Sequence, residues 1–108
     1  MERLTSKLTK ENLWIYILRL LQEGPKYGYE LREEIKKRFD FMPGKVTSYA
    51  VLYSLRREGL VDVQEMKGSG EVTRKYYVIT EKGQSAMKQA KAFIKKLLNH
   101  VFDLTPDS

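Results

Sequence analysis

Residues 44–61 read G-K-V-T-S-Y-A-V-L-Y-S-L-R-R-E-G-L-V, and this stretch decides the fold. Gly44 interrupts whatever precedes it, and the hydroxyl of Thr47 or Ser48 can accept a hydrogen bond from the first free amides of a new helix. Gly59 suits a left-handed stop at the other end. We therefore expect a helix of about three turns between these signals.

The two faces of this predicted helix differ in chemistry. Val51, Leu52 and Leu55 form an apolar face. The opposite face is small, polar and basic, and it comprises Thr47, Ser48, Ala50, Ser54 and Arg57, with Tyr49, Tyr53 and Arg56 along its margin. A helix in the DNA major groove needs short polar side chains and cations of this kind. An ordinary solvated helix with a basic exterior fits the segment equally well, so the neighbouring segments must decide.

The preceding segment favours a helix-turn-helix. Residues 27–39 carry Leu31, Ile35 and Phe39 at i, i+4 and i+8, which predicts a second amphipathic helix. Its many charged residues are typical of a solvated helix face and do not indicate an acid/base pair. Residues 40–44 form the turn that leads into the helix predicted within residues 44–61.

The following segment favours a β-hairpin. Residues 61–66 alternate as a strand should, and residues 72–79 form a β-rich return strand after a glycine-containing loop. Three cations lie at or near the tip, where a winged helix places positive charge against phosphate: Lys67, Arg74 and Lys75. The alternative is a plain hairpin with exposed cations.

The two ends of the chain carry an excess of apolar residues. Residues 10–22 form a predicted helix that is apolar on nearly every side, so its own domain covers one face and a second subunit covers another. Thr80 can cap a last helix over residues 81–102, whose apolar residues repeat every seven positions. This seam could fold back as core, but a dimer interface is favoured, comprising Trp14, Ile17, Met87, Ala90, Ile94, Leu97 and Val101.

Composition narrows the function classes. The 108 residues include 20 Lys and Arg against 14 Asp and Glu, which gives a net charge of +6 and favours a polyanionic partner. Residues 1–43, 44–80 and 81–108 each contribute +2, so only the fold can gather the charge into a patch. The lack of cysteine excludes disulfides, thiolate zinc sites and cysteine nucleophiles. We find no signal peptide and no apolar run of membrane-spanning length, and expect a soluble, cytoplasmic protein.

Catalytic chemistry is not indicated. His100 is the single histidine, and only Asp103 is placed to assist it near a helix end. Metalloprotease, nucleotide-phosphate and dinucleotide signatures do not occur. The sequence therefore predicts a protein that is not an enzyme and has no cofactor and no metal site.

Three motifs in this order and spacing resemble the PadR family of winged-helix transcriptional regulators, in its subgroup with a short C-terminus. They are E-G-P-K-Y-G-Y-E-L at 23–31, Y-A-V-L-Y-S-L-R-R-E-G-L-V at 49–61 and R-K-Y-Y-V-I-T-E-K-G at 74–83, and the similarity runs from about residue 13 to residue 83. The resemblance implies a homodimer built from the first and last helices. It also implies DNA contacts from Thr47, Ser48 and Tyr49, with Lys45 beside them, support from Tyr27 and a wing cation at Arg74.

Together these observations predict an α+β, mainly α fold: a winged helix-turn-helix domain at 1–80 and a dimerisation helix at 81–108. The expected function is a homodimeric repressor that reads a pseudo-palindromic operator in double-stranded DNA. The expected DNA-binding residues are Tyr27, Lys45, Thr47, Ser48, Tyr49, Ser54, Arg57, Lys67, Arg74 and Lys75. An aromatic effector held near Trp14 and Phe93 is a further hypothesis. The alternative function is a winged-helix module that binds a protein partner.

Overall fold

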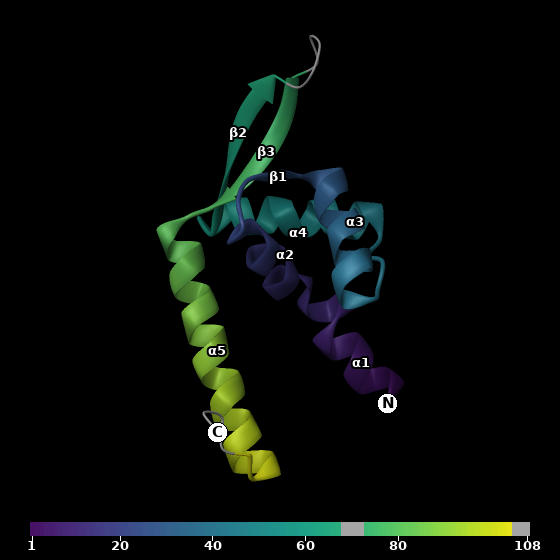
Figure 1. Cartoon of the computed structure of the whole chain (residues 1–108), viewed down its shortest axis with the longest axis vertical. Coiled ribbons are helices and arrows are strands. Elements are labelled where there is room, and N and C mark those ends of the chain that lie inside the picture. Colours follow the sequence, from purple (N-terminus) through teal and green to yellow (C-terminus); the bar gives the residue numbers. More distant parts are fainter. Residues whose placement is uncertain (68–72, 105–108) are drawn as a thin grey trace.

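The computed structural model of the chain describes residues 1–67 and 73–104. The elements in chain order are α1 (Glu2–Leu8), the 3-10 turn η1 (Lys10–Asn12), α2 (Leu13–Leu21), β1 (Lys26–Tyr27), α3 (Gly28–Phe39), α4 (Lys45–Arg57), β2 (Val61–Lys67), β3 (Thr73–Ile79) and α5 (Glu81–Phe102). The hairpin of β2 and β3 projects from one end of the helical body, and α5 extends in the opposite direction (Figure 1). The chain therefore measures 54 × 30 × 25 Å. The predicted α+β, mainly α winged-helix fold is confirmed.

The hydrophobic core surrounds α2. This helix contacts α3, α4, α5 and β3, so elements of its own chain cover most of its surface. Five of its nine residues are buried: Leu13, Ile17, Leu18, Leu20 and Leu21. Ile17 is only 1% exposed. Its predicted place in a dimer interface is therefore wrong, because the core of its own chain encloses the side chain.

The helix predicted over residues 10–22 is shorter than expected. A 3-10 turn occupies residues 10–12, and the α-helix begins only at Leu13. The Thr9 hydroxyl donates to the Thr5 carbonyl oxygen at 2.6 Å, so it completes the end of α1 and does not cap the next helix. The backbone of Thr9, at φ −120° and ψ −88°, leaves the helical region and separates the two elements.

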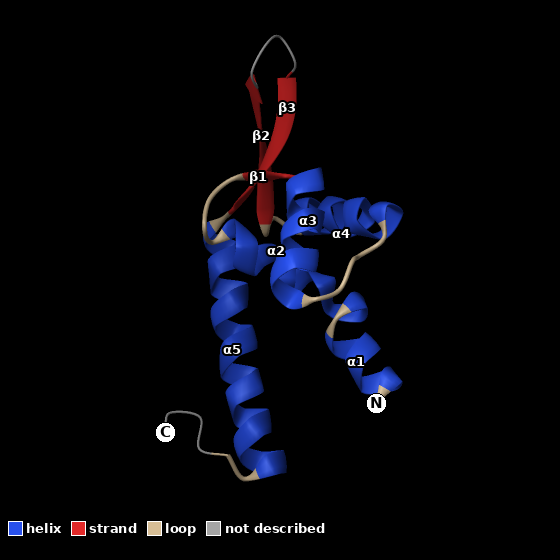
Figure 2. Cartoon of the chain, turned by 45° about the vertical axis from the view of Figure 1, so that its right-hand side comes forward, coloured by secondary structure: helices blue, strands red, loops and turns tan. Residues whose placement is uncertain are grey.

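The sheet contains a strand that the sequence pattern did not predict. In the described part of the chain its order is β1-β3-β2, with both neighbouring pairs antiparallel (Figure 2). The hairpin register runs from Val61 opposite Ile79 to Lys67 opposite Thr73. The short β1 places Tyr27 opposite Tyr76. Both hairpin strands were predicted, although Val72, the expected first residue of the return strand, lies outside the described residues.

Helix α5 has the predicted bounds. Its N-cap is Thr80, whose hydroxyl oxygen accepts a hydrogen bond from the Gly83 amide at 3.1 Å. Of its described residues only Gly83 is buried. The apolar seam beyond Ala90 is therefore largely exposed to solvent in the single chain.

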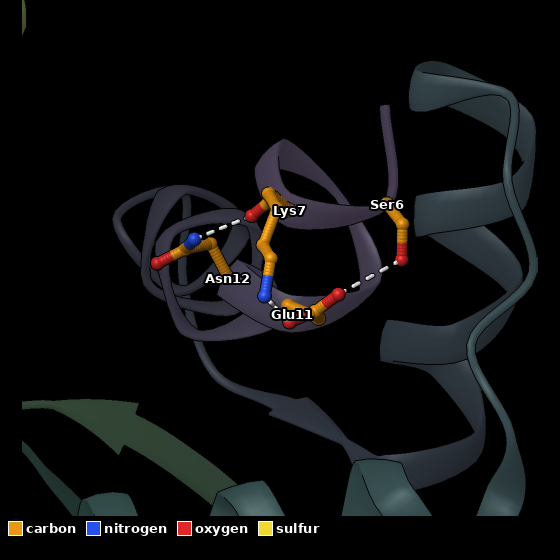
Figure 3. Close-up of polar contacts among 4 residues, drawn as sticks. All are labelled: Ser6, Lys7, Glu11 and Asn12. Carbon is orange, nitrogen blue, oxygen red and sulfur yellow. Dashed lines mark hydrogen bonds and ion pairs between the residues drawn. The ribbon is translucent and has the colours of Figure 1, made fainter. Parts of the chain in front are cut away.

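Contacts among four residues join α1 to the 3-10 turn η1 (Figure 3). The Lys7 ammonium lies 2.8 Å from Glu11 Oε1, and the Ser6 hydroxyl donates to Glu11 Oε2 at 3.1 Å. The Asn12 side-chain amide donates to the Lys7 carbonyl oxygen. The hydrogen bond from Lys7, followed by that from Ser6, holds the pKa of Glu11 below its ordinary value of 4.5.

This junction predicts a pH dependence of stability. Because the pKa of Glu11 is lowered in the folded state, its contribution is complete above pH 4.5 and is lost as the pH falls through the folded value. We expect wild type to unfold at a higher urea midpoint than Glu11→Gln at pH 6, and this gap to narrow progressively as the pH falls below 4.5. Glu33→Gln, at an exposed carboxylate on α3, controls for the loss of one charge. A gap that does not change as the pH falls below 4.5 would contradict this role for the carboxylate.

Candidate nucleic-acid interface

Helix α4 begins at Lys45 because Gly44 supplies an extended N-cap, at φ −64° and ψ 149°. The predicted capping by Thr47 or Ser48 is wrong, since no side chain caps this helix. The Ser48 hydroxyl instead donates to the Gly44 carbonyl oxygen at 2.7 Å. Ser48 is only 3% exposed, so it cannot contact DNA from this position, and we correct that expectation.

The inner face of α4 is formed by Ser48, Leu52 and Leu55, which are all buried. Their spacing of i, i+4 and i+7 brings them onto one side of the helix. Burial of the polar Ser48 is tolerated because its hydroxyl has a main-chain partner. Gly59 follows the C-cap Glu58, and its φ of +79° is the predicted left-handed stop. Two amide hydrogen bonds close the last turn: Gly59 to Arg56 at 3.0 Å and Leu60 to Leu55 at 2.9 Å.

The outward face of α4 is centred nearer to Val46 and Tyr53 than the sequence indicated, since Tyr53 was expected at its margin and Val46 was not named. Val46 is 84% exposed and Tyr53 66% exposed, the largest values among the large apolar and aromatic side chains of the helix. Ala50 and Arg57 are also exposed. The Arg57 guanidinium lies over the Tyr53 ring at 5.9 Å. The spacing 46, 50, 53, 57 lies opposite the buried side and was the signal that could have identified Val46.

The flanks of this face hold the other predicted residues of α4. Lys45 and Thr47 are exposed, as expected, and Tyr49 is 41% exposed. Ser54 is half-buried and turns toward a hollow beside Trp14. No acidic residue occurs between Asp40 and Glu58, so α4 itself carries only positive formal charge.

The wing presents a stacked arginine. The Arg74 guanidinium lies 4.6 Å from the centroid of the Tyr27 ring, and that ring meets Tyr76 edge-on at 5.6 Å. The pairing of β1 with β3 places Tyr27 opposite Tyr76, so the unpredicted strand supports the stack. A cation–π contact at an exposed site contributes about 0.5–1 kcal/mol, enough to bias the orientation of Arg74.

The other wing cations have less defined surroundings. Lys75 is exposed and pairs in register with Glu65, so an acid shares its side of the hairpin. Lys67 is the last residue of β2, and its side chain lies outside what the structure describes. Arg74 is therefore the wing cation with the best-defined position.

A tyrosine-rich hollow connects the wing to α4. It has a volume of about 540 Å³ and is lined by Tyr27, Tyr29, Tyr49, Arg74, Lys75 and Tyr77. Burial raises the pKa of Tyr77 above its ordinary value of 10, and the nearby Tyr49 adds to the rise while Arg56 opposes it. The Tyr77 phenol therefore stays protonated at neutral pH and remains able to donate a hydrogen bond to an anion.

Tyr49 occupies a position that depends on Gly28. A Cβ atom built on Gly28, the first residue of α3, would lie 2.5 Å from the Tyr49 hydroxyl oxygen and 2.6 Å from its ring. Only glycine allows this approach of α4 to α3. Tyr49 thus links the two helices of the helix-turn-helix, in addition to lining the hollow.

The residues predicted at an effector site are not brought together within one chain. A second hollow, of about 640 Å³, lies between α2, α4 and the start of α5 and is lined in part by Trp14, Ala50, Ser54 and Ala86. The Trp14 indole N–H donates to Asn12 Oδ1 at 3.3 Å. Phe93 is 66% exposed on α5 and does not line this hollow.

The predicted dimer residues of α5 become more exposed with distance from its N-terminus. Met87 and Ala90 are half-buried against the rest of the chain. Farther along, exposure rises from 42% at Ile94 and Leu97 to 62% at Val101. This apolar surface is unexplained by the single chain.

Other kinds of site find no support in the described ranges. Within residues 1–67 and 73–104, no group of three or more His, Cys, Asp or Glu side chains could hold a metal ion. Across the same part of the chain, every helix is too short or too polar to span a lipid bilayer.

The contact between Gly28 and Tyr49 predicts a coupled stability effect. Gly28→Ala should lower the free energy of unfolding by about 1–3 kcal/mol, because the added methyl group must displace the Tyr49 ring. In a Tyr49→Ala background the same change should have almost no effect, as a double-mutant cycle in chemical denaturation would measure. An equal penalty in both backgrounds would show that another neighbour obstructs the methyl group.

Comparison with known proteins agrees with this geometry. A model of the family described as "Transcriptional regulator PadR-like family" matches residues 17–89. An uncharacterised protein of Lysinibacillus sphaericus is 33% identical over 86 residues, which cover 78% of this chain and 79% of that protein.

Two solved structures are also similar. A PadR family transcription regulator of Clostridium difficile R20291 is 29% identical, with a TM-score of 0.70 over 83% of this chain and 97% of that one. Bacillus subtilis PadR, solved in complex with operator DNA, shares the fold at 23% identity and a TM-score of 0.65, over 71% of this chain and 45% of that one. Because the family model matches well over half of the residues, the chain belongs to the PadR-like family of transcriptional regulators.

Proposed function

We propose that this regulator binds a specific operator in double-stranded DNA as a homodimer and represses transcription. The observation that carries the proposal is that α4, which has no acidic residue, and the wing line one hollow, beside an arginine stacked on Tyr27. Such a surface suits a major groove flanked by phosphates. The operator complex of Bacillus subtilis PadR, which has the same fold, supports the proposal.

The proposed roles of the DNA-facing residues follow from their exposure. Lys45 and Thr47, in the first turn of α4, lie where a recognition helix contacts base edges. Arg57 and Arg74 would neutralise phosphates, and the stacking of each on a tyrosine ring orients it in advance. Tyr49 would act partly by holding α4 against Gly28. Ser54 is half-buried and would only support this face.

The proposed homodimer rests on the exposed apolar seam of α5. Ile94, Leu97 and Val101 lie along one side of the helix and are 42–62% exposed. A second copy would cover them, with residues 1–80 forming the DNA-binding part and residues 81–108 the dimerisation helix. Two recognition helices about 34 Å apart would then enter successive major grooves of a pseudo-palindromic site. A dimer bound across a promoter would prevent other proteins from binding there, and it would therefore repress transcription.

An aromatic effector is a separate part of the proposal. The hollow beside Trp14 borders α4 directly, so a ligand bound there would act on the recognition helix. Phe93 of a second copy could complete the site. Trp14 is the single tryptophan, so unchanged fluorescence across a panel of aromatic compounds would count against this role.

A protein that binds an operator must be in the compartment that holds the chromosome, which we take to be the cytoplasm.

The phosphate contacts can be tested by salt dependence. A dimer that loses one phosphate contact in each half should show a plot of log K against log salt that is shallower by about 1.8. We expect this change for Arg57→Ala and for Arg74→Ala, measured by fluorescence anisotropy with a duplex from the chain's own promoter region. Lys96→Ala, at an exposed lysine of α5, is the charge-matched control and should leave the slope unchanged.

Two results of this titration would count against the proposal. An unchanged slope in both arginine variants would remove the phosphate role. Equal binding to a scrambled duplex would favour the alternative, a winged-helix module that binds a protein partner.

The dimer can be tested separately. Leu97→Glu should shift the protein from dimer to monomer in sedimentation velocity, because two carboxylates would face an apolar seam. Lys96→Glu introduces the same side chain at the adjacent exposed position and should leave the dimer intact. Retained secondary structure in Leu97→Glu, by circular dichroism, would exclude unfolding as the cause. A Leu97→Glu variant that stays dimeric would place the interface elsewhere.

A further inference from the structure

We propose that Lys82 is a positioning residue that holds the end of the recognition helix on the start of α5, so that the direction of α5 determines where the recognition helix lies. The inference rests on the proposed DNA-binding dimer, and it assigns a mechanical role to a residue outside the DNA-facing surface. Lys82 lies at the second position of α5, immediately after the wing.

Three consecutive carbonyl oxygens at the end of α4 are held from this side. The Lys82 ammonium donates to the Glu58 carbonyl oxygen at 2.8 Å, and the Thr80 hydroxyl donates to that of Gly59 at 2.6 Å. The Thr80 amide donates to the Leu60 carbonyl oxygen at 3.1 Å. The same Thr80 oxygen accepts from the Gly83 amide and thereby caps α5. The end of one helix and the beginning of the other therefore share one hydrogen-bond cluster.

Close packing leaves the junction little freedom. A Cβ atom on Gly83 would lie 2.3 Å from the Leu60 carbonyl oxygen and 2.7 Å from Ile79 Cγ1, so the backbones are in direct contact. A Cβ atom on Gly59 would lie 3.7 Å from Lys82 Cδ, which places the lysine stem along the left-handed turn. A rotation of α5 at this point must move the end of α4 or break these contacts.

Electrostatics explain why a lysine suits this position. The last carbonyl groups of a helix lack intrahelical partners and carry partial negative charge, which a nearby cation stabilises. Glu58 is the C-cap of α4, and its carbonyl oxygen is the group that Lys82 contacts. Arg57, in the last turn, is directed over Tyr53. Because Lys82 is exposed, its contact contributes little to global stability, and its main effect is on geometry.

The length of α5 amplifies a small change at the junction. A helix of this length extends about 33 Å, so a 10° change of tilt moves its far end by about 6 Å relative to α4. In the proposed dimer the far part of α5 is fixed to a second copy, and the same tilt would displace the recognition helices. The spacing between half-sites that the dimer prefers would then depend on Lys82.

The first experiment needs no DNA. The chain has no cysteine, so Tyr53→Cys and Lys96→Cys give two unique spin-label sites, on α4 and α5. Their distance distribution, measured by pulsed electron resonance in labelled protein diluted with unlabelled protein, reports the angle between the helices. We expect Lys82→Met to broaden or shift the distance distribution. Lys82→Arg, which keeps the positive charge, and Lys88→Met should both keep the wild-type distribution. An unchanged distribution in Lys82→Met would overturn the inference whatever the protein binds.

The second experiment compares operators whose half-sites are separated by the native spacing or by one base pair more or fewer. If wild type prefers the native spacing about tenfold, we expect Lys82→Met to reduce the preference to about threefold or less. The salt slope should stay at the wild-type value, and Lys82→Arg should restore the preference.

Other outcomes of the operator experiment separate the possibilities. A uniform loss of affinity with a slope shallower by about 1.8 would make Lys82 a phosphate contact and overturn the inference. A loss of affinity that is equal at all spacings and accompanies a lower thermal midpoint would mean that Lys82 has only a structural role. That result would also overturn the inference. A wild type that binds no duplex specifically would refute the proposed function, while the distance measurement would still decide the junction.

Discussion

The burial of α2 is the constraint on which the rest of the structure depends. Leu18 and Leu20 have no exposed surface, and three further residues of this nine-residue helix are at most 2% exposed. Each such side chain contributes about 1.5–3 kcal/mol when it is fully removed from water, so the helix has to be enclosed. Elements from the middle and the end of the chain enclose it: α3, α4, β3 and α5. The helix-turn-helix, the wing and α5 are thereby placed around one apolar centre.

This arrangement gives the molecule two ends with different chemistry. At one end, α4 and the hairpin expose cations and tyrosine rings, including the Arg74 stack on Tyr27. At the other, α5 exposes an apolar seam that no described element covers. The elements that form these two ends are joined at Gly59, just after α4, and Thr80, just before α5. The Thr80 hydroxyl donates to the Gly59 carbonyl oxygen at 2.6 Å. A surface that suits DNA and a surface that suits a second copy are thus rigidly connected within one short chain.

The tyrosines near α4 have a structural as well as a chemical role. Tyr49 fills the space that Gly28 leaves open, and Tyr27 supports the wing cation from the edge of the sheet. Burial keeps Tyr77 protonated well above neutral pH. Aromatic rings that hold neighbouring elements together while keeping a hydroxyl near the surface combine rigidity with the ability to donate hydrogen bonds. The surface formed by α4 and the wing is therefore largely organised within the single chain.

The sequence by itself determined the elements that local patterns specify. The spacing of Leu31, Ile35 and Phe39, the left-handed stop at Gly59 and the cap at Thr80 each depend on residues within a few positions, and the structure has α3, the end of α4 and the start of α5 where these signals indicate.

Only the tertiary structure decided which side of each helix is covered and which distant residues meet. Ser48 was expected to face outward but is buried, because the side of α4 that carries it packs toward α2. Its hydroxyl donates to the Gly44 carbonyl oxygen, so burial leaves no polar group unpaired. Ile17 was expected at a dimer interface and lies in the core. Strand β1 is too short to show a pattern of its own, and it forms because β3 offers it hydrogen-bond partners 49 or more residues away. Such long-range contacts leave no trace in local spacing. The stacking of Arg74 on Tyr27 and the hydrogen bond from Lys82 to the Glu58 carbonyl oxygen therefore became apparent only in the folded chain.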